Sequence, residues 1–338
     1  MTRPGPRNLR RRAAPAAVVA SGLVASACSS NAPSALEPRG PAAQQIADIW
    51  WLMFFLATVV YLVVGGLIIV GALRGRGTEG QGRPSRISDD AFIWVGGLIV
   101  PAVILAILAV VTVQSVNTLR KPEKNALQIE VTGYRWWWEV RYPKEGITTA
   151  NEIRIPAGRP VSIGLRTADV IHSFWVPELA GKVDNIPDHR NVLNLKAEKP
   201  GVYRGQCAEF CGIQHAKMAF LVRADPPATF NRWVARQQRP PSTPVGESAA
   251  KGQLVFNRST CGACHTIRGT EARGTYGPDL TDFGDRRTIG AVAVPNTRAN
   301  LAKWIVDAQS FKPGNLMPPI HMPPDDVTAL LDYLESQR

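Results

Sequence analysis

Cysteine, histidine and methionine are scarce in this chain, which holds five of each among its 338 residues. With so few soft or borderline metal donors, their positions carry more information than their number. Four of the cysteines form two close pairs, Cys207 with Cys211 and Cys261 with Cys264, and Cys28 stands alone near the N-terminus. No further cysteine follows Cys264, which argues against a four-ligand zinc site in the last part of the chain.

The chain also lacks a basic surface of the kind that binds nucleic acid, although its formal net charge is +12. Residues 1–118 hold ten Lys and Arg against five Asp and Glu, and most of these cations lie in the N-terminal leader and one short loop. Residues 247–338 hold ten residues of each sign. This distribution excludes nucleic-acid binding. The length leaves room for about two domains beyond a targeting sequence.

Five donor residues for a soft or borderline metal lie within the twelve residues Cys207–Met218. They offer two thiolates, an imidazole, a thioether and an oxygen, and a further imidazole lies upstream in Ile171-His-Ser-Phe-Trp-Val-Pro177. Thiolate, imidazole and thioether ligands together suit copper far better than magnesium or calcium. The candidate ligands are His172, Cys207, Glu209, Cys211, His215 and Met218.

The spacing of the two cysteines bears on the number of metal ions. A single-copper blue site needs one Cys and two His, with a weak axial thioether. Here Cys211 follows Cys207 by four residues, so two thiolates on one loop could bridge two copper ions, each with one imidazole. Met218 and the carbonyl of Glu209 would be weaker axial ligands. The alternative is a disulfide between the two cysteines, which an oxidising compartment permits but which leaves the imidazoles and the thioether without a role.

The segment Cys261-Gly-Ala-Cys-His265 has the form of a covalent haem c attachment site. Cys261 and Cys264 would form the thioether bonds, and His265 would be the proximal iron ligand. A helix expected over Ala249–Asn257 leads into this motif. We therefore expect residues 247–338 to form an all-α class I cytochrome c domain.

A distal methionine ligand is expected in a Pro-rich loop, since Met/His ligation raises the haem potential. Met317, within Lys312-Pro-Gly-Asn-Leu-Met-Pro-Pro319, meets this expectation. His321 and Met322 are competing donors close by. The remaining histidine, His189, is expected to be an ordinary surface or turn residue.

The N-terminal residues resemble a secretory leader. Arginines between Arg3 and Arg12 form a positive region, and Ala13–Val24 is an apolar stretch that ends in small residues. Cys28 follows Ala25-Ser-Ala and precedes two serines, as the lipidated cysteine of a bacterial lipoprotein does. We expect residues 1–27 to be a signal peptide of the lipoprotein type, with lipid on Cys28. The alternatives are an ordinary cleaved leader and an uncleaved tail.

Two long apolar runs follow the leader, Ile49–Leu73 and Ala91–Val116. Each is long enough to cross a hydrocarbon core of about 30 Å, and Pro101 is tolerated in a span that packs against other helices. We expect residues 44–118 to form a two-helix transmembrane hairpin. The connecting residues 74–90 carry four arginines, so the positive-inside rule predicts that they are cytoplasmic and that the rest of the chain faces outward. Haem c is attached in that outer compartment.

Short β-rich runs separated by Gly, Pro and Asn turns begin at Leu127. This pattern predicts a small antiparallel sandwich or barrel over residues 119–225. The candidate copper ligands fall in two loops at strand ends, with His172 in the first and Cys207–Met218 between the last two strands. Loops held rigidly in this way suit a copper electron-transfer site, because its ligands must barely move. The expected strands are Leu127–Val131, Trp136–Tyr142, Glu152–Ile155, Val161–Arg166, Val192–Leu195 and Phe220–Arg223.

Residues 226–246 are expected to be a linker, since they contain five prolines and no acidic residue. A short helix around Phe230–Gln238 is expected within it. A Pro-rich tether is semi-rigid, so it would keep the haem domain near the copper domain while allowing it some swing.

Taken together, these segments resemble cytochrome c oxidase subunit II with a cytochrome c domain fused at its C-terminus, as in caa-type bacterial terminal oxidases. The resemblance covers roughly residues 40–338 and implies a multidomain membrane protein. Its parts would be a two-helix transmembrane hairpin, an all-β cupredoxin-like sandwich and the cytochrome c domain. Besides the paired spans, it rests on Trp136-Trp-Trp-Glu-Val-Arg-Tyr142, His172-Ser-Phe-Trp-Val-Pro-Glu-Leu179 and Cys207–Met218.

The resemblance implies roles for single residues. The six candidate copper ligands map onto the family's binuclear, mixed-valence CuA centre, which holds two copper ions. Glu209 would bind copper through its backbone oxygen and a magnesium ion, shared with subunit I, through its side chain. Trp136 matches the aromatic residue through which electrons enter, whereas core packing is the alternative for Trp137 and Trp138.

The chain departs from the family pattern at two places. It carries Tyr134-Arg135 before Trp136, where His-Gln or Tyr-Gln is usual. Asp89 and Asp90 lie near the start of the second span, where an acidic residue feeds a proton path in some relatives, but without a clear register.

The implied activity is that of the electron-input subunit of a respiratory haem-copper cytochrome c oxidase. A cytochrome bc complex or a soluble cytochrome c would reduce the fused haem, and the copper pair would reduce haem a of subunit I, where oxygen is reduced and protons are pumped. The partners would be oxidase subunits I and III in the bacterial inner membrane, with both cofactor domains on the periplasmic side. Two alternatives remain, a CuA-containing subunit of a nitric oxide reductase and a non-catalytic copper-binding lipoprotein.

Overall fold

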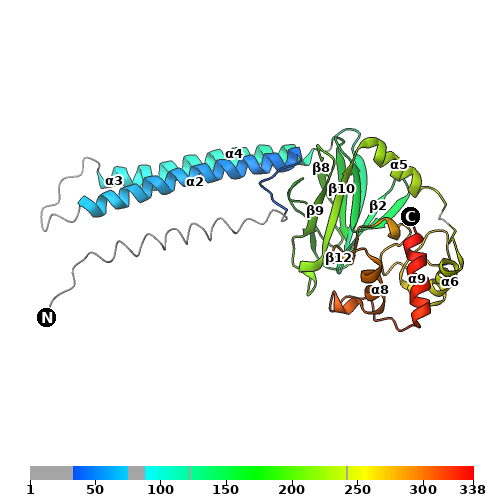
Figure 1. Ribbon diagram of the computed structural model, residues 1–338. Helices are drawn as coiled ribbons and strands as arrows, with labels where there is room; N and C mark the ends of the chain where they lie inside the picture. Colours follow the sequence, from blue (N-terminus) through cyan, green and yellow to red (C-terminus); the bar gives the residue numbers. More distant parts are fainter. Residues whose placement is uncertain (1–32, 75–87, 122, 241–242) are drawn as a thin grey trace, which may run out of the picture.

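The computed structural model describes residues 33–74, 88–121, 123–240 and 243–338. Figure 1 shows two long helices side by side that project from a β-sandwich, and a helical domain packed against the other end of that sandwich. The expected signal peptide over residues 1–27, the lipidated Cys28 and most of the arginine-bearing loop lie outside the described residues.

The projecting pair consists of α2 (Pro41–Arg74) and a second run formed by α3 (Asp89–Phe92), a π-helical segment η3 (Ile93–Ile99) and α4 (Val100–Arg120). Both runs are long and apolar enough to cross a membrane, and no residue of their most apolar windows is buried in the isolated chain. The π-helical segment ends beside Pro101, whose missing N–H interrupts regular α-helical hydrogen bonding. The spans expected from the sequence lie inside these two helical runs.

The sandwich has two five-stranded sheets, in the order β3-β2-β1-β5-β8 and β4-β10-β9-β6-β7. The strand pairs β1 with β5 and β4 with β10 are parallel, so the expectation of a purely antiparallel sandwich is wrong for these pairs. The strands are β1 (Leu127–Tyr134), β2 (Trp137–Tyr142), β3 (Ile147–Ala150), β4 (Glu152–Pro156), β5 (Val161–Thr167), β6 (His172–Trp175), β7 (Val183–Asn185), β8 (Asn191–Leu195), β9 (Gly201–Cys207) and β10 (Ala219–Asp225).

Period-two alternation in the strands places the core between the two sheets. In β1 every second residue is buried, and the same pattern in β2 buries Trp138 completely. The Trp138 ring meets Phe174 and Phe220 edge-on at centroid distances of 5.6 and 5.4 Å, and these two rings stack at 4.2 Å. This aromatic cluster adjoins the candidate copper ligands, since the Trp138 ring lies 5.8 Å from the His172 ring.

Helix α5 (Pro227–Gln237) lies inside the segment expected to be a linker, but it packs on the sandwich. Its residues Phe230 and Trp233 are buried in the sandwich core, and the Trp233 ring lies 5.2 Å from Tyr142. The expected helix therefore exists and begins slightly earlier. It also shortens the free tether to the nine residues between α5 and the next helix.

The C-terminal domain has four α-helices among its described residues, α6 (Glu247–Arg258), α7 (Cys261–Cys264), α8 (Arg298–Val306) and α9 (Pro324–Ser336). Helices α6 and α9 pack so closely that a Cβ at Gly252 would lie 2.0 Å from the Ala329 carbonyl oxygen. The domain is not strictly all-α, since β11 (Thr288–Ile289) and β12 (Val294–Pro295) form a small ribbon. Short 3-10 turns complete the structure at η4 (His215–Lys217), η5 (Phe283–Asp285) and η6 (Ala308–Ser310).

Candidate copper centre and haem site

Two neighbouring strands of the second sheet bring the first pair of metal donors together. His172 is the first residue of β6 and Cys207 is the last residue of β9, and the strands pair with Phe174 opposite Cys207. The expectation that His172 lies in a loop is therefore wrong by one position, since it opens a short strand. The remaining donors come from residues 207–218, which we call the copper loop and which connect β9 to β10.

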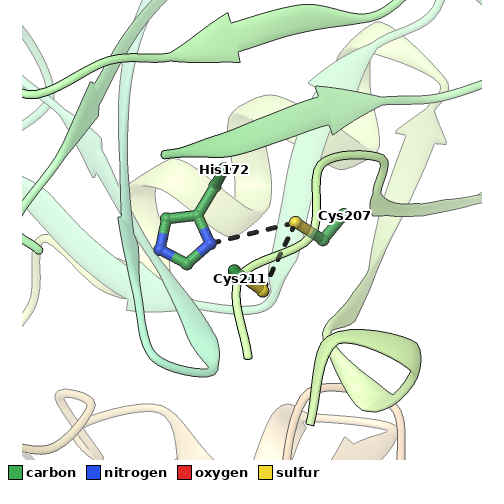
Figure 2. Close-up of side chains that lie close together, drawn as sticks. All are labelled: His172, Cys207 and Cys211. Atoms are coloured by element: carbon green, nitrogen blue, oxygen red, sulfur yellow. Dashed lines mark hydrogen bonds between the residues drawn. The ribbon is translucent and has the colours of Figure 1, made fainter. Parts of the chain in front are cut away.

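The four sulfur and nitrogen donors of the copper loop converge with His172, and Figure 2 shows His172 beside the two cysteines. The Sγ atoms of Cys207 and Cys211 lie 3.8 Å apart, and His172 Nδ1 lies 3.8 Å from the Cys207 sulfur. His215 Nδ1 and Met218 Sδ lie 3.6 and 3.7 Å from the Cys211 sulfur. Each thiol thus has one imidazole beside it, which is the arrangement that two bridging thiolates require.

Both thiols are free, and their sulfurs are much farther apart than the ~2.05 Å of a disulfide bond. The disulfide considered from the sequence is therefore not formed in this structure. The hydrogen bond between the two sulfurs lowers the pKa of Cys207 and raises the pKa of Cys211. A bound cation would displace the thiol protons, because the thiolate is the form that binds metal.

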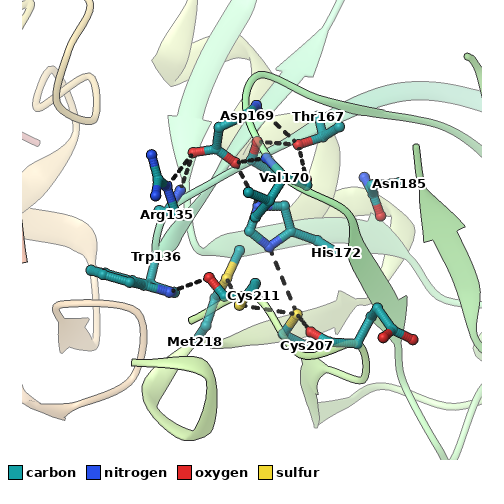
Figure 3. A network of polar contacts seen from close by, with 12 residues as sticks. Arg135, Trp136, Thr167, Asp169, Val170, His172, Asn185, Cys207, Cys211 and Met218 are labelled. Atoms are coloured by element: carbon teal, nitrogen blue, oxygen red, sulfur yellow. Dashed lines mark hydrogen bonds and ion pairs between the residues drawn. The ribbon is translucent and has the colours of Figure 1, made fainter. Parts of the chain in front are cut away.

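An acidic residue orients the His172 ring (Figure 3). Asp169 Oδ1 lies 2.9 Å from His172 Nε2, which leaves Nδ1 directed at the sulfurs. Burial alone lowers the pKa of His172, but the hydrogen bonds to Asp169 and Cys207 outweigh burial and raise it. The carboxylate is itself held by the backbone N–H groups of Arg135 and Val170, at 2.7 Å each. Such a carboxylate fixes the tautomer and orientation of a ligating histidine.

Trp136 lies beside the copper loop and is only 9% exposed. Its indole Nε1 donates a hydrogen bond to the Cys211 carbonyl at 2.9 Å. Gly212 has a positive φ of 117°, and a Cβ there would approach the indole ring to 3.0 Å. Glycine at this position therefore permits both the loop conformation and the contact with Trp136.

Glu209 has its backbone carbonyl at the donor cluster and is itself an exposed residue. Its backbone carbonyl lies 3.2 Å from the Cys207 sulfur, facing the donor cluster. Its side chain is exposed, and the next residue, Phe210, is 77% exposed. The Glu209 carbonyl can therefore serve as a weak oxygen ligand of the donor cluster. The exposed Glu209 carboxylate and the exposed Phe210 ring are neighbours on the surface of the copper loop. Thiolate, imidazole, thioether and carbonyl donors at these spacings fit copper.

The geometry around His265 fits a proximal haem ligand. Its Nδ1 lies 2.8 Å from the Pro278 carbonyl, which can only accept, so the ring proton is on Nδ1 and Nε2 is left for iron. Burial lowers the pKa of His265, which favours the neutral, ligating form. The ring packs on Gly277, where a Cβ would lie 2.4 Å from it. Cys261 and Cys264 are half-buried free thiols on the single turn of α7.

Met317 lies in residues 311–317, which we call the haem loop. Its N–H donates to Asn315 Oδ1 at 2.8 Å and its carbonyl accepts from Gln309 Nε2 at 2.8 Å, so the backbone at Met317 is held on both sides. Of the competing donors, Met322 packs against the apolar core of the domain and His321 is exposed.

Two residues of these sites were missed from the sequence. Asp169 precedes His172 by three residues, and an acidic residue so close to a candidate ligand was a signal that could have been used. Lys312 is buried near Trp136, and nothing in the sequence distinguishes it from the lysines of exposed loops. His189 is exposed, as expected.

Comparison with known proteins gives consistent matches along the chain. Residues 145–225 match the family described as cytochrome c oxidase subunit II, periplasmic domain, and residues 249–338 match the cytochrome c family. Cytochrome c oxidase subunit 2 of Alkalihalophilus pseudofirmus is 35% identical over 311 residues, covering 90% of this chain and 90% of that protein. The protein of the same name from Bacillus sp. strain PS3 is 33% identical over 340 residues, covering 93% and 94%.

Among solved structures, the crystal structure of the periplasmic domain of subunit II of the cytochrome oxidase of Bradyrhizobium japonicum (CoxB) is similar to part of this chain. It is 31% identical, with a TM-score of 0.34. The match covers 35% of this chain and 97% of that domain.

Proposed function

This chain belongs to the cytochrome c oxidase subunit II family, in the form that carries a fused cytochrome c domain, and from that premise we propose that it is the electron-input subunit of a haem-copper oxidase. When bound, its copper and haem c supply one-electron transfer between a cytochrome donor and haem a of subunit I. Oxygen reduction and proton pumping then take place in subunit I.

The copper ligands in this proposal are His172, Cys207, Glu209, Cys211, His215 and Met218. The observation that carries the proposal is the position of the two thiols between the two imidazoles, with one Nδ1 at 3.6–3.8 Å from each sulfur. This arrangement supports a count of two copper ions, because a single-copper site needs only one thiolate. Asp169 would hold the His172 ring in place as copper binds.

We assign a separate role to the Glu209 side chain. Its exposure on the outer side of the copper loop supports a magnesium ion shared with subunit I, since carboxylate oxygen suits a hard cation. The next residue, Phe210, is also exposed, which supports this face of the copper loop as the surface that contacts subunit I. Subunit III would complete the complex.

Haem c would be held by thioether bonds to Cys261 and Cys264, with His265 as the proximal and Met317 as the distal ligand. The hydrogen bond between His265 and the Pro278 carbonyl supports the proximal assignment. Trp136, hydrogen-bonded to the Cys211 carbonyl, would be the residue through which electrons reach the copper centre.

The two apolar helices support a membrane anchor. We propose that both span the bacterial inner membrane, so that the sandwich and the cytochrome domain lie on the periplasmic side. Domain boundaries would follow the expected plan, with a hairpin at residues 44–118, a copper domain at 119–225 and a haem domain at 247–338. The expected linker at 226–246 would be shorter, because α5 packs on the copper domain. Lipid on Cys28 would add a second anchor. A cytochrome bc complex or a soluble cytochrome c would be the donor.

The test is metal and spectral analysis of the purified oxidase complex. We expect an EPR spectrum in which one unpaired electron is shared over two coppers, and the optical spectrum of a low-spin His/Met haem. Oxygen consumption with reduced cytochrome c separates an oxidase from a nitric oxide reductase. A single-copper EPR signal in place of the shared one would contradict the CuA assignment.

A further inference from the structure

The haem loop packs directly on the copper loop. Gln214 Nε2 donates to the Pro313 carbonyl at 2.6 Å, and Lys217 Nζ donates to the Phe311 carbonyl at 2.6 Å. A Cβ on Gly314 would lie 2.3 Å from a side-chain carbon of the copper loop, so the two loops are in close contact. The cytochrome domain thus meets the sandwich next to the copper donors.

A second contact region fixes the orientation of the cytochrome domain. Glu152 Oε1, on β4, accepts hydrogen bonds from the backbone N–H groups of Arg287 and Thr288 and from the Thr288 hydroxyl, at 2.8–3.0 Å. Nearby, Thr149 Oγ1 lies 3.2 Å from the buried carboxylate of Asp282. Contacts at two separate places on the sandwich prevent the domain from rotating about either one.

Lys312 belongs to the haem loop and is only 3% exposed. Its Nζ donates to the Trp136 carbonyl at 2.7 Å and to the Gly290 carbonyl at 3.0 Å, so its partners are backbone dipoles rather than a carboxylate. Burial lowers the pKa of Lys312 to about 7. A buried lysine without a carboxylate partner is costly, and the charge of the Cys211 sulfur offsets the burial only in part.

The contact of Lys312 completes a continuous route of covalent and hydrogen bonds between the two cofactor sites. The Met317 N–H donates to Asn315 Oδ1 at 2.8 Å, and Asn315 Nδ2 donates to the Lys312 carbonyl at 2.7 Å. The Lys312 ammonium then reaches the Trp136 carbonyl, and the Trp136 indole reaches the Cys211 carbonyl at 2.9 Å. Electronic coupling is stronger through such bonds than across an equal gap, and it falls steeply as the gap widens.

We propose that Lys312 is a positioning residue for electron transfer between haem c and the copper centre, because its ammonium fixes the haem loop on the Trp136 carbonyl. This inference rests on the proposed function, since it requires both cofactors in their assigned sites. Lys312 contacts neither copper nor iron, and its effect is to set the separation and contact of the two loops.

The test compares the wild-type oxidase complex with Lys312→Met, which keeps the length of the side chain but removes the donor. Haem c is reduced by a flash-activated ruthenium compound, and its reoxidation by the copper centre is followed optically. We expect reoxidation to slow by about 10- to 100-fold, the scale that a displacement of about 1 Å has in positioned reactions. The haem c potential and both cofactor spectra should stay unchanged.

A readout that does not depend on activity comes from hydrogen–deuterium exchange of the copper-free full chain. In Lys312→Met, backbone amides in residues 134–138 and 287–292 should exchange faster than in wild type, because the interface opens more often. Lys312→Arg retains a donor and should recover most of the electron-transfer rate. Lys251→Met is the matched control, since it removes an exposed cation paired with Asp326 inside the cytochrome domain.

The outcomes are distinguishable. A wild-type complex without copper or haem c would overturn the proposed function itself. A wild-type complex with both cofactors, together with a Lys312→Met complex of equal transfer rate and equal exchange, would overturn this inference alone. If Lys312→Met does not assemble, Lys312→Gln replaces it, because the shorter amide cannot reach the same carbonyl. An unchanged rate in that variant would overturn the inference, and a slowed one would support it.

Discussion

At the scale of single residues, the ring of His172 is held from both sides. Asp169 lies against Nε2 and the Cys207 sulfur against Nδ1, and the ring is completely buried. A ligand fixed in this way before metal binds pays little entropy when it binds, and it moves little when the metal changes charge. The carboxylate of Asp169 is therefore as much a part of the site as the ligands are.

Replacement of Asp169 by alanine should weaken copper binding by about 10- to 100-fold, the usual effect of losing the partner of a ligating histidine. The reason is that the His172 ring loses the acceptor that fixes its tautomer. Competition with a colorimetric copper chelator measures the affinity. Asp184→Ala, on the neighbouring strand β7, is the control and should bind copper as wild type does. Equal affinity in both variants would show that Asp169 does not support the ligand.

The sequence was informative at the residues that form local motifs. All six expected copper donors converge, because five of them lie on one loop and the sixth opens an adjacent strand. The burial of Lys312 could not be predicted, because it depends on a contact between two domains. Lys312 and its partner Trp136 are 176 residues apart in sequence. Burial of a charged side chain is a property of the assembled fold and has no local signature.

At the scale of elements, α5 extends the sandwich into a segment that composition marks as a linker. Its prolines and cations resemble a tether, but Phe230 and Trp233 lie three positions apart, on one helix face, and are buried in the sandwich core. The Arg154 guanidinium also lies over the Trp233 ring, 5.5 Å from the centroid of that ring. The helix thereby anchors the start of the tether.

Replacement of Trp233 by alanine should destabilise the sandwich by about 3–5 kcal/mol, as is usual when a buried aromatic side chain is removed. The midpoint of thermal unfolding, measured by calorimetry, should fall accordingly. Residues 226–246 should also become sensitive to protease, because α5 would no longer be held. Arg232→Ala, an exposed neighbour on the same helix, should change neither property. Intact protection of this segment in Trp233→Ala would contradict the role of α5 as an anchor.

Six strands were expected from the sequence, and each has a counterpart near its expected position. In the sandwich, the four that were missed are β3, β6, β7 and β9, and the ribbon strands β11 and β12 were not expected either. Three of the four span only three or four residues, and β9 begins at Gly201 and contains Gly205, which weakens its strand pattern. The parallel pairings could not be predicted either, because they depend on which sheet each strand joins after a crossover.

At the scale of the whole molecule, the cytochrome domain is held to the sandwich both by contacts and by a tether of nine residues. Such a tether spans at most about 30 Å when fully extended. It therefore keeps the haem domain near the copper domain even when the interface opens. Each opening is followed by return to the same partner rather than by exchange with another molecule.

Insertion of ten Gly and Ser residues into the tether should lower the effective concentration of the haem domain by only about threefold, because this quantity falls with roughly the −3/2 power of length. Since the docked state is held by its own contacts, the rate of haem c reoxidation should change by less than that factor. Flash reduction of the purified complex measures it. A much larger loss of rate would mean that the tether, not the interface, sets the docked geometry.

The near-complete burial of Trp136 has a consequence for how such an oxidase can change its donor. Under the proposed function, a cytochrome arriving from solution would meet the helical domain first, so donor recognition and metal chemistry would reside in different parts of the chain. Selection for a new donor would act on residues 247–338 and leave the copper ligands untouched. The fusion would thereby separate the two roles, so that residues 247–338 can vary while the copper ligands stay constant.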